Sequence, residues 1–360
     1  MVEKEELDRS AAMIAECRKE MGLRIVGQKE MIDGLLSSLV AGGHILLEGV
    51  PGLAKTLAVK SLAEITGLEF KRIQFTPDLL PADLTGTMIW GTAAERDSSS
   101  EGSRSAHANS GFSVRKGPIF ANVILADEIN RAPAKVQSAL LEAMAEKPVT
   151  IGETSYPLPD PFFVLATENP IEHEGTYSLP EAELDRFLMK LLITYPAPDE
   201  ELDIVKNTPS MSSGSTSMGA PLSPVLNMEK LSMLRKTADS IHIDEGISKY
   251  IVSIVTATRP AYTRFSQGGS AAVTRAEKSA SDSVYRYVTF GASVRASIAL
   301  YRCCRFFAMF EGRNFVTPED VKTAALPVLR HRIVLSYEAE AEGMDADTVI
   351  ARILKNVPVP

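Results

Sequence analysis

The stretch GVPGLAKT at residues 49–56 decides how the rest of this 360-residue chain is interpreted. A short apolar run, HILL at residues 44–47, stands directly before it, and apolar residues at helical spacing follow it as far as Gly67. An apolar run of this length after two glycines is typical of a buried strand, and a glycine after the last periodic position is typical of a helix C-terminus. We therefore predict a strand, a glycine-rich turn and a helix.

Such a turn presents successive backbone N–H groups and a helix N-terminus, which together solvate phosphate oxygens, so we interpret the unit as a P-loop for ATP. Lys55 would neutralise the β- and γ-phosphates, and the Thr56 hydroxyl would coordinate Mg²⁺. We expect the whole loop to contact the nucleotide, through Gly49, Val50, Pro51, Gly52, Leu53, Ala54, Lys55, Thr56 and Leu57.

One position departs from the usual P-loop pattern G-x-x-x-x-G-K-[ST], because Ala54 stands where the second glycine is expected. Alanine fits if this residue has helical backbone angles, while Gly49 and Gly52 keep the flexible positions. Taken alone, the motif leaves a chance strand, loop and helix open as an alternative.

Two carboxylates end a second apolar run, NVILADE at residues 122–128. A parallel strand in an α/β fold would deliver such side chains to the ligand-binding edge of the sheet. Asp127 would hold Mg²⁺, directly or through water, and Glu128 would polarise the water that attacks the γ-phosphate. The alternative is a pair of turn residues at a strand end, but a P-loop upstream favours the functional interpretation.

A third predicted strand, residues 162–166, runs into Asn169, which precedes Pro170. The amide of Asn169 could reach the γ-phosphate or its water. An asparagine before proline is also a common turn residue, so this assignment needs support from elsewhere in the chain.

The composition indicates a globular protein with room for two domains. A net charge of −8 gives no sign of non-specific DNA binding, although a local basic patch would not be visible at this level. Cys17, Cys303 and Cys304 have neither zinc-ligand nor disulfide spacing, so we expect reduced core thiols. The charged N-terminus and the lack of a long apolar stretch predict a cytoplasmic protein without membrane insertion.

Polar tracts divide the chain. The tract at residues 92–111 carries almost no large apolar side chains, and the short runs on either side of it predict a hairpin over residues 87–115. Trp90 lies in one arm of this hairpin. Such a tryptophan is more often packed under the hairpin than in contact with a partner. A second hairpin is predicted at residues 149–156. A Ser-, Met- and Gly-rich stretch at 209–219 separates a predicted α/β core, residues 1–205, from predicted helices over residues 222–360, and residues 259–290 form another polar insertion.

Five motifs together resemble the MoxR-type AAA+ ATPases in order and spacing. They are GVPGLAKT, ILADEINRAP at 124–133, ATENP at 166–170, LPEAELDRF at 179–187 and GASVRA at 291–296. Alanine before the P-loop lysine is usual in this family. The resemblance covers the chain from about residue 24 onward and implies an AAA+ core, with a parallel sheet between helices, followed by a smaller all-α lid.

The resemblance also implies roles for single residues. Lys55 matches the Walker A lysine, and Asp127 and Glu128 match the Walker B carboxylates. Asn169 matches sensor 1, and Arg186 matches the arginine finger, which in AAA+ proteins reaches into the neighbouring subunit's site. Arg295 matches sensor 2, which we expect to act within its own subunit as the lid closes, although Val294 replaces the proline common before it. The segment containing Val26 and Gly27 matches the part of the family that lines the adenine pocket.

In function, the resemblance implies Mg²⁺-dependent ATP hydrolysis by a ring, which we expect to be a hexamer, with the two hairpins facing a central pore. It further implies chaperone-like remodelling or maturation of protein complexes, in some cases metal or cofactor insertion, with a von Willebrand factor A domain protein as a partner. The alternative is a DNA-acting AAA+ motor, although we do not expect nucleic acid as the partner. A scaffold that binds nucleotide without turnover fits poorly, because Glu128 is present.

Overall fold

The computed structural model describes residues 4–50, 52–91, 111–170, 176–206, 222–260 and 284–360. Its centre is a five-stranded sheet in the order β2-β5-β8-β1-β9, and every neighbouring pair is parallel. The strands are β1 (Ile45–Gly49), β2 (Phe70–Gln74), β5 (Val123–Asp127), β8 (Phe163–Glu168) and β9 (Met189–Ile193). The sheet confirms the predicted α/β core, and β9 is a strand that the sequence analysis did not identify.

Both faces of this sheet are covered, which is why its strands are nearly continuous apolar runs. Successive side chains of a strand point to opposite faces, so Ile45 and Leu47 join one hydrophobic cluster and Leu46 joins the other. The first cluster contains α2 (Lys29–Ala41) and α3 (Lys55–Thr66), and the second contains α4 (Pro81–Thr85) and α5 (Ala134–Glu146). Gly67 ends α3 with a left-handed φ of 64°, as predicted.

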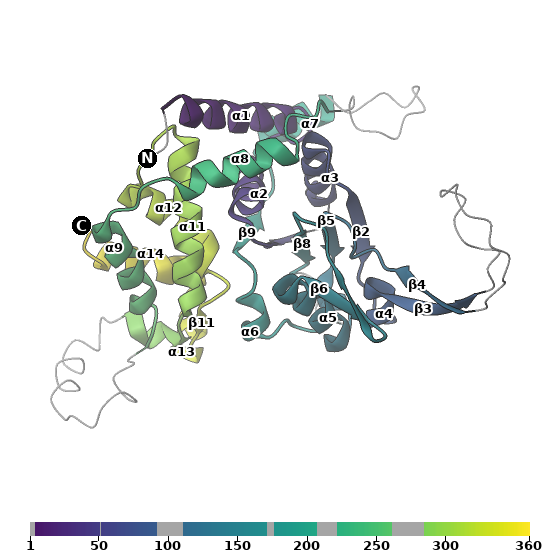
Figure 1. Cartoon of the computed structure of the whole chain (residues 1–360). Coiled ribbons are helices and arrows are strands. Elements are labelled where there is room, and N and C mark those ends of the chain that lie inside the picture. The colour runs from purple at the N-terminus through teal and green to yellow at the C-terminus, as the bar shows by residue number, and fades with distance from the viewer. Residues whose placement is uncertain (1–3, 51, 92–110, 171–175, 207–221, 261–283) are drawn as a thin grey trace.

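Two hairpins leave this core where the sequence predicted them. The first pairs β3 (Gly86–Gly91) with β4 (Gly111–Lys116) and projects from the body of the molecule (Figure 1). The rest of this insertion, residues 92–110, lies outside the described residues. Trp90 packs edge-to-face on Phe112 but is 61% exposed, so the favoured expectation of a tryptophan packed under the hairpin is wrong. The second hairpin pairs β6 (Pro148–Ile151) with β7 (Thr154–Pro157).

The lid follows as a group of helices beside the sheet (Figure 1). It contains α8 (Met228–Asp239), α9 (Glu245–Ala257), α11 (Val294–Phe310), α12 (Pro318–Leu329), α13 (Tyr337–Ala341) and α14 (Ala346–Asn356). A two-stranded ribbon of β10 (Val288–Phe290) and β11 (Val334–Leu335) joins them. Helix α12 begins with Thr317 as N-cap, Pro318 in its first turn and a capping box to Asp320, the start that the sequence predicted.

The first helix, α1 (Lys4–Gly22), lies across both parts of the chain (Figure 1). Its buried side chains, including Ile14, Cys17 and Met21, belong to one hydrophobic cluster that also contains α2, α3 and the lid helices. The division into 1–205 and 222–360 therefore stays a prediction, since apolar packing continues across it. No described helix is long and apolar enough to cross a bilayer. Burial raises the pKa of all three cysteine thiols to about 12.

Two shorter helices frame the end of the core. Helix α6 (Glu181–Leu184) stands just before β9, and α7 (Pro198–Lys206) follows the other end of that strand. Because β9 is parallel to β1, the residue after α6 lies near the start of β1, while α7 lies beside the loop that follows β1. The parallel strands thus place one set of residues at their amino ends and another at their carboxyl ends, which are called here the amino edge and the carboxyl edge of the sheet.

Candidate functional site

The loop after β1 lies at the carboxyl edge of the sheet. A Cβ atom at Gly49 would stand 2.8 Å from the carbonyl oxygen of Ile193, so close packing against β9 requires glycine there. Gly52 has a positive φ of 87° with open space around it. Ala54 has a φ of 54°, which is the left-handed region, so the condition of ordinary helical angles is not met and alanine carries a strain of about 1–2 kcal/mol. Pro51 lies outside the described residues.

Lys55 stands at the first position of α3 with its side chain across the mouth of this loop. Its Nζ donates to the carbonyl of Gly49 at 2.5 Å and lies 3.5 Å from the carbonyl of Glu168. Burial lowers the pKa of Lys55, while the carboxylates of Asp127, Glu128 and Glu48 act to raise it. The ammonium group is thus held by backbone oxygens where phosphate oxygens would replace them.

The two predicted Walker B carboxylates end β5, next to β8. Thr167 organises them, because its hydroxyl donates to Asp127 Oδ1 at 2.6 Å and accepts from the backbone N–H of Glu128 at 2.8 Å. Arg72 donates to Asp127 Oδ2 at 2.7 Å, and Gln74 donates to Glu128 at 2.7 Å. Sequence analysis missed these three residues, although the pairing of Gln74 with Asp127 in the β2–β5 register would place Arg72 and Gln74 at this edge.

The backbone of Glu128 has a φ of 56°, a left-handed conformation that is rare for a residue with a side chain. Strain of this kind costs roughly 1–3 kcal/mol and collects at functional sites. The Glu128 carboxylate also lies 3.2 Å from Nε of Arg131. The turn therefore holds the carboxylate toward the loop at some cost to stability.

Asn169 follows β8 and is buried, with 5% of its surface exposed. Glu168, the last residue of that strand, is buried too, which raises its pKa, while Lys190 acts to lower it. Lys55, Asp127 and Asn169 thus come from the ends of three neighbouring strands or the loops after them. The structure brings together at one edge the residues predicted for phosphate, magnesium and water.

The donors at this edge suit Mg²⁺, which prefers oxygen ligands and in nucleotide sites takes only one or two from the protein. The Thr56 hydroxyl and the Asp127 carboxylate are such donors, and the Thr167 hydrogen bond orients the carboxylate. No group of three His, Cys, Asp or Glu side chains in the described part of the chain could hold a metal by itself. A magnesium ion here would complete its coordination with phosphate oxygens and water.

The segment predicted to line the adenine pocket lies under α7. Gly27 has a positive φ of 75°, and a Cβ there would stand 2.3 Å from Oε2 of Glu200 on α7. Gln28 donates to the carbonyl of Thr194 at the end of β9. Val26 and Gly27 are therefore on the same side of the sheet's carboxyl edge as the loop.

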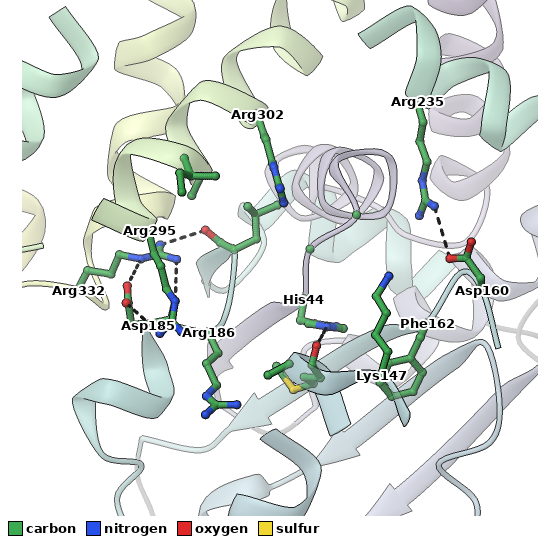
Figure 2. A pocket seen from close by; sticks show the side chains of 17 residues that line it. His44, Lys147, Asp160, Phe162, Asp185, Arg186, Arg235, Arg295, Arg302 and Arg332 are labelled. Carbon is green, nitrogen blue, oxygen red and sulfur yellow. Dashed lines mark hydrogen bonds and ion pairs between the residues drawn. The ribbon is translucent and has the colours of Figure 1, made fainter. Parts of the chain in front are cut away.

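The two predicted arginines lie elsewhere. Both line a cavity of about 340 Å³ beside Gly43 and His44, which directly precede β1 (Figure 2). Arg186 follows α6 and donates to the carbonyl of Leu141 at 2.7 Å. Arg295, in the first turn of α11, is paired with Asp185 at 3.6 Å, and its side chain is 60% exposed. The two arginines lie near the start of β1 and Lys55 lies after its end, and a strand of this length spans about 15 Å.

Arg186 lies away from the phosphate loop of its own subunit, and its role as a finger stays a prediction. The position of Arg295 corrects the expectation that it closes over the phosphate loop of its own subunit. The reason is the packing of the lid, since α11 packs on α2 and α12 packs on β9, which brings the start of α11 to the amino edge of the sheet. Sequence analysis also missed the other cations of this cavity, which are Lys147, Arg235, Arg302 and Arg332.

Comparisons with known proteins agree with this architecture. Residues 44–189 match the ATPase family associated with various cellular activities (AAA), and residues 283–353 match the AAA lid domain. The chain is 43% identical to chaperone MoxR1 of Mycobacterium tuberculosis over 336 residues, covering 93% of this chain and 79% of that protein. The chain belongs to the MoxR family of AAA+ ATPases. It therefore hydrolyses ATP in a chaperone-like role.

Other relatives give the same picture for this MoxR-type ATPase. YeaC of Bacillus subtilis is 40% identical over 93% of this chain and 91% of its own length. Protein MoxR of Paracoccus denitrificans is 30% identical, with 93% of both chains covered. The crystal structure of a putative ATPase from Cytophaga hutchinsonii has 44% identity and a TM-score of 0.83, covering 99% of this chain and 97% of that one. The predicted family and fold are thus confirmed.

Proposed function

We propose that this MoxR-type ATPase hydrolyses Mg²⁺-bound ATP at sites shared between neighbouring subunits of a ring, and uses the energy to remodel protein complexes. One observation carries the proposal: the phosphate loop and the two arginines lie at opposite edges of the same sheet. A site with both parts then needs two copies, the loop of one facing the arginines of the next. Such a head-to-tail contact closes into a ring when the rotation per subunit is right.

Within one subunit, the carboxyl edge would supply binding and the attacking water. The loop from Gly49 to Leu57 would surround the phosphates, Lys55 would move from the carbonyl of Gly49 to phosphate oxygens, and Val26 and Gly27 would contact adenine. Thr56 and Asp127 would hold Mg²⁺, which when bound would neutralise phosphate charge. Glu128 would accept the proton of the attacking water, and Asn169 would orient that water or the γ-phosphate.

From the next subunit, Arg186 and Arg295 would stabilise the charge that spreads over the γ-phosphoryl oxygens in the transition state. Arg295 is suited to this because its side chain is mostly exposed and its pairing with Asp185 is long. A guanidinium has five N–H donors, so a phosphate can accept charge-assisted hydrogen bonds from Arg295 while Asp185 keeps its contact.

The proposal that the remodelled substrate is a protein is supported by the family to which the chain belongs. The relatives named as chaperone and MoxR support a protein as the substrate of remodelling. The exposed Trp90 and Phe112 on the first hairpin offer an apolar contact for such a client. A ring of six copies, a von Willebrand factor A domain partner and a role in metal insertion are proposed from the family resemblance alone.

The test mixes Arg186→Ala with Glu128→Gln, each inactive by itself, under conditions in which subunits exchange. Some sites in mixed rings would pair an intact Glu128 with an intact Arg186 from next door, so activity should return. The same experiment with Arg295→Ala tests the second arginine. A mixture that stays inactive after verified exchange would contradict the shared site. Stimulation by single-stranded DNA that fades steeply with salt would support a DNA motor instead.

A further inference from the structure

Asp185, the residue directly before Arg186, is contacted by three side chains of the lid, of which Figure 2 shows Arg295 and Arg332. Arg332 donates through Nε to Asp185 Oδ1 at 2.8 Å. The Ser293 hydroxyl donates to Asp185 Oδ2 at 2.8 Å, and Arg295 lies 3.6 Å from the same oxygen. The Asp185 side chain is only 15% exposed. Asp185 is therefore adjacent to Arg186 in the chain and in contact with Arg295 through its carboxylate.

Arg332 ties the segment around the finger to the lid. Its side chain is 2% exposed, and its guanidinium also donates to the backbone carbonyls of Asp185 at 3.2 Å and Leu188 at 3.1 Å. Further bonds reach the carbonyls of Phe187 and Val328. Burial lowers the pKa of Arg332, and the Asp185 carboxylate acts against this. A rigid guanidinium with several acceptors holds residues 185–188 in one geometry relative to the end of α12.

The other side of Asp185 fixes the start of α11. Ser293 is the N-cap of that helix, and its Oγ accepts from the backbone N–H of Arg295 at 3.0 Å while its hydroxyl hydrogen goes to Asp185. The cap therefore takes its orientation from Asp185. Displacing the carboxylate would disturb both the finger segment and the first turn of α11.

We propose that Asp185 is the positioning residue that sets Arg186 and Arg295 as one unit for the ATP site of the next subunit, with Arg332 as its buried partner. This inference rests on the shared site proposed above. The competing view is that Asp185 and Arg332 only join the lid to the core.

A second ion pair provides a matched control. Arg330 pairs with Asp347 at 2.8 Å, and it donates to the carbonyl of Lys190 in β9, so it too joins the end of α12 to the core. Among the described residues, Arg330 donates to Asp347 and Lys190 and not to Asp185, Arg186 or Arg295. Asp347→Asn should lower stability without changing the turnover of assembled rings.

Asp185→Asn keeps the size of the side chain and removes its charge. We expect kcat to fall about a hundredfold, the scale of a catalytic group misplaced by about 1 Å. The affinity of the variant for ATP should change less than about twofold, because its own phosphate loop is at the opposite edge of the sheet. A kcat near that of the unmodified protein would overturn the proposal, as would an equal loss in Asp347→Asn.

Mixing experiments separate a positioning role from a general defect. Asp185→Asn mixed with Glu128→Gln should regain activity, because the intact Glu128 of one meets the intact arginines of the other. Asp185→Asn mixed with Arg186→Ala should stay inactive, because both are defective at the same edge. If Glu128→Gln did not restore activity to Asp185→Asn after verified exchange, the proposed role of Asp185 would be overturned, while the shared site would still stand. An inactive mixture of Arg186→Ala and Glu128→Gln would overturn the shared site as well.

Asp185→Asn leaves Arg332 as a buried charge without its carboxylate partner, and this alone could unfold the surrounding structure. A double variant covers that case. Asp185→Asn combined with Arg332→Met removes both charges, which avoids an unpaired buried ion. We expect its melting temperature to lie closer to that of the unmodified protein while turnover stays low. Recovery of turnover together with stability would show a purely structural pair and would contradict the proposal.

Discussion

The two edges of the central sheet differ in how the chain builds them. At the carboxyl edge, each functional group comes from a strand end or the loop after it, and the residues lie in three short motifs. At the amino edge, the cavity joins Gly43 and His44, the end of α5, the segment after α6, and the lid helices α8 and α11. The residues of the carboxyl edge come from short sequence motifs, whereas the residues of the amino edge come together only through the packing of the lid.

This difference has a consequence for charge. At the carboxyl edge, Asp127, Glu128 and Glu48 act on Lys55 and also pair with Arg72, Arg131 and Lys190, so acidic and basic side chains lie there together. The carboxylates suit a site that takes up Mg²⁺ with its nucleotide. The cavity at the amino edge is lined by six basic side chains and two aspartates, which suits contact with an anion supplied by another molecule. Four predictions test whether the two edges are as separate as the structure indicates.

The largest effect is expected at the carboxyl edge. Lys55→Ala should abolish detectable ATP binding, because the phosphate loop loses its mobile cation. Titration with a fluorescent ATP analogue measures this. Arg186→Ala is the control at the other edge and should bind ATP normally as a dilute subunit. Unchanged affinity in Lys55→Ala would contradict the assignment of the phosphate loop.

Glu128→Gln should leave ATP binding close to normal and reduce turnover by about a hundredfold or more, the scale of a lost general base. The amide keeps the shape of the side chain and its contact with Gln74 but cannot accept a proton. Steady-state hydrolysis together with equilibrium binding measures both quantities. If turnover persisted, the water would be activated by another group.

Acid should destabilise the amino edge first. Burial lowers the pKa of His44 to about 4 and that of His331 well below its usual value, with Lys147 and Arg332 respectively acting in the same direction. An unfolded histidine titrates near 6.5, so between roughly pH 6.5 and 4 the unfolded state binds more protons. The free energy of unfolding then falls as pH falls, by at most about 1.4 kcal/mol per pH unit for each histidine.

The hydrogen bonds of His44 fix the tautomer of its neutral ring. Its Nδ1 accepts from the backbone N–H of Val164 at 3.0 Å, so the neutral ring carries its proton on Nε2, which faces the carbonyl of Met144. Denaturant unfolding at pH 7 and pH 5 measures the loss, and His44→Gln should show a smaller difference between the two. An equal difference in both proteins would mean that His44 does not contribute.

The smallest effect is expected for Ala54→Gly. Glycine relieves the left-handed strain at this position but has more freedom in the unfolded chain, so a net gain of about 0–1 kcal/mol is expected. A thermal melt shows this as a rise of a few degrees or less. A clear loss of stability would mean that the Ala54 methyl group packs usefully in the loop.

The carboxyl edge could be predicted from the sequence because its chemistry follows from local rules. A glycine-rich turn between a strand and a helix exposes its N–H groups whatever surrounds it, and parallel strands bring their carboxyl ends to the same edge. Lys55, Asp127 and Asn169 were found in this way. Thr167 was not, because a hydrogen bond to Asp127 depends on the register of β5 against β8.

The sequence by itself determined the phosphate loop, the carboxylate pair, the two hairpins and the family. Each of these depends on residues close together in the chain, where backbone geometry leaves little choice. Only the tertiary structure decided where Arg295 lies and what holds it. Asp185, Ser293 and Arg332 are far apart in sequence and meet because α11 and α12 pack under the amino edge of the sheet, a contact set by side-chain fit over the whole lid.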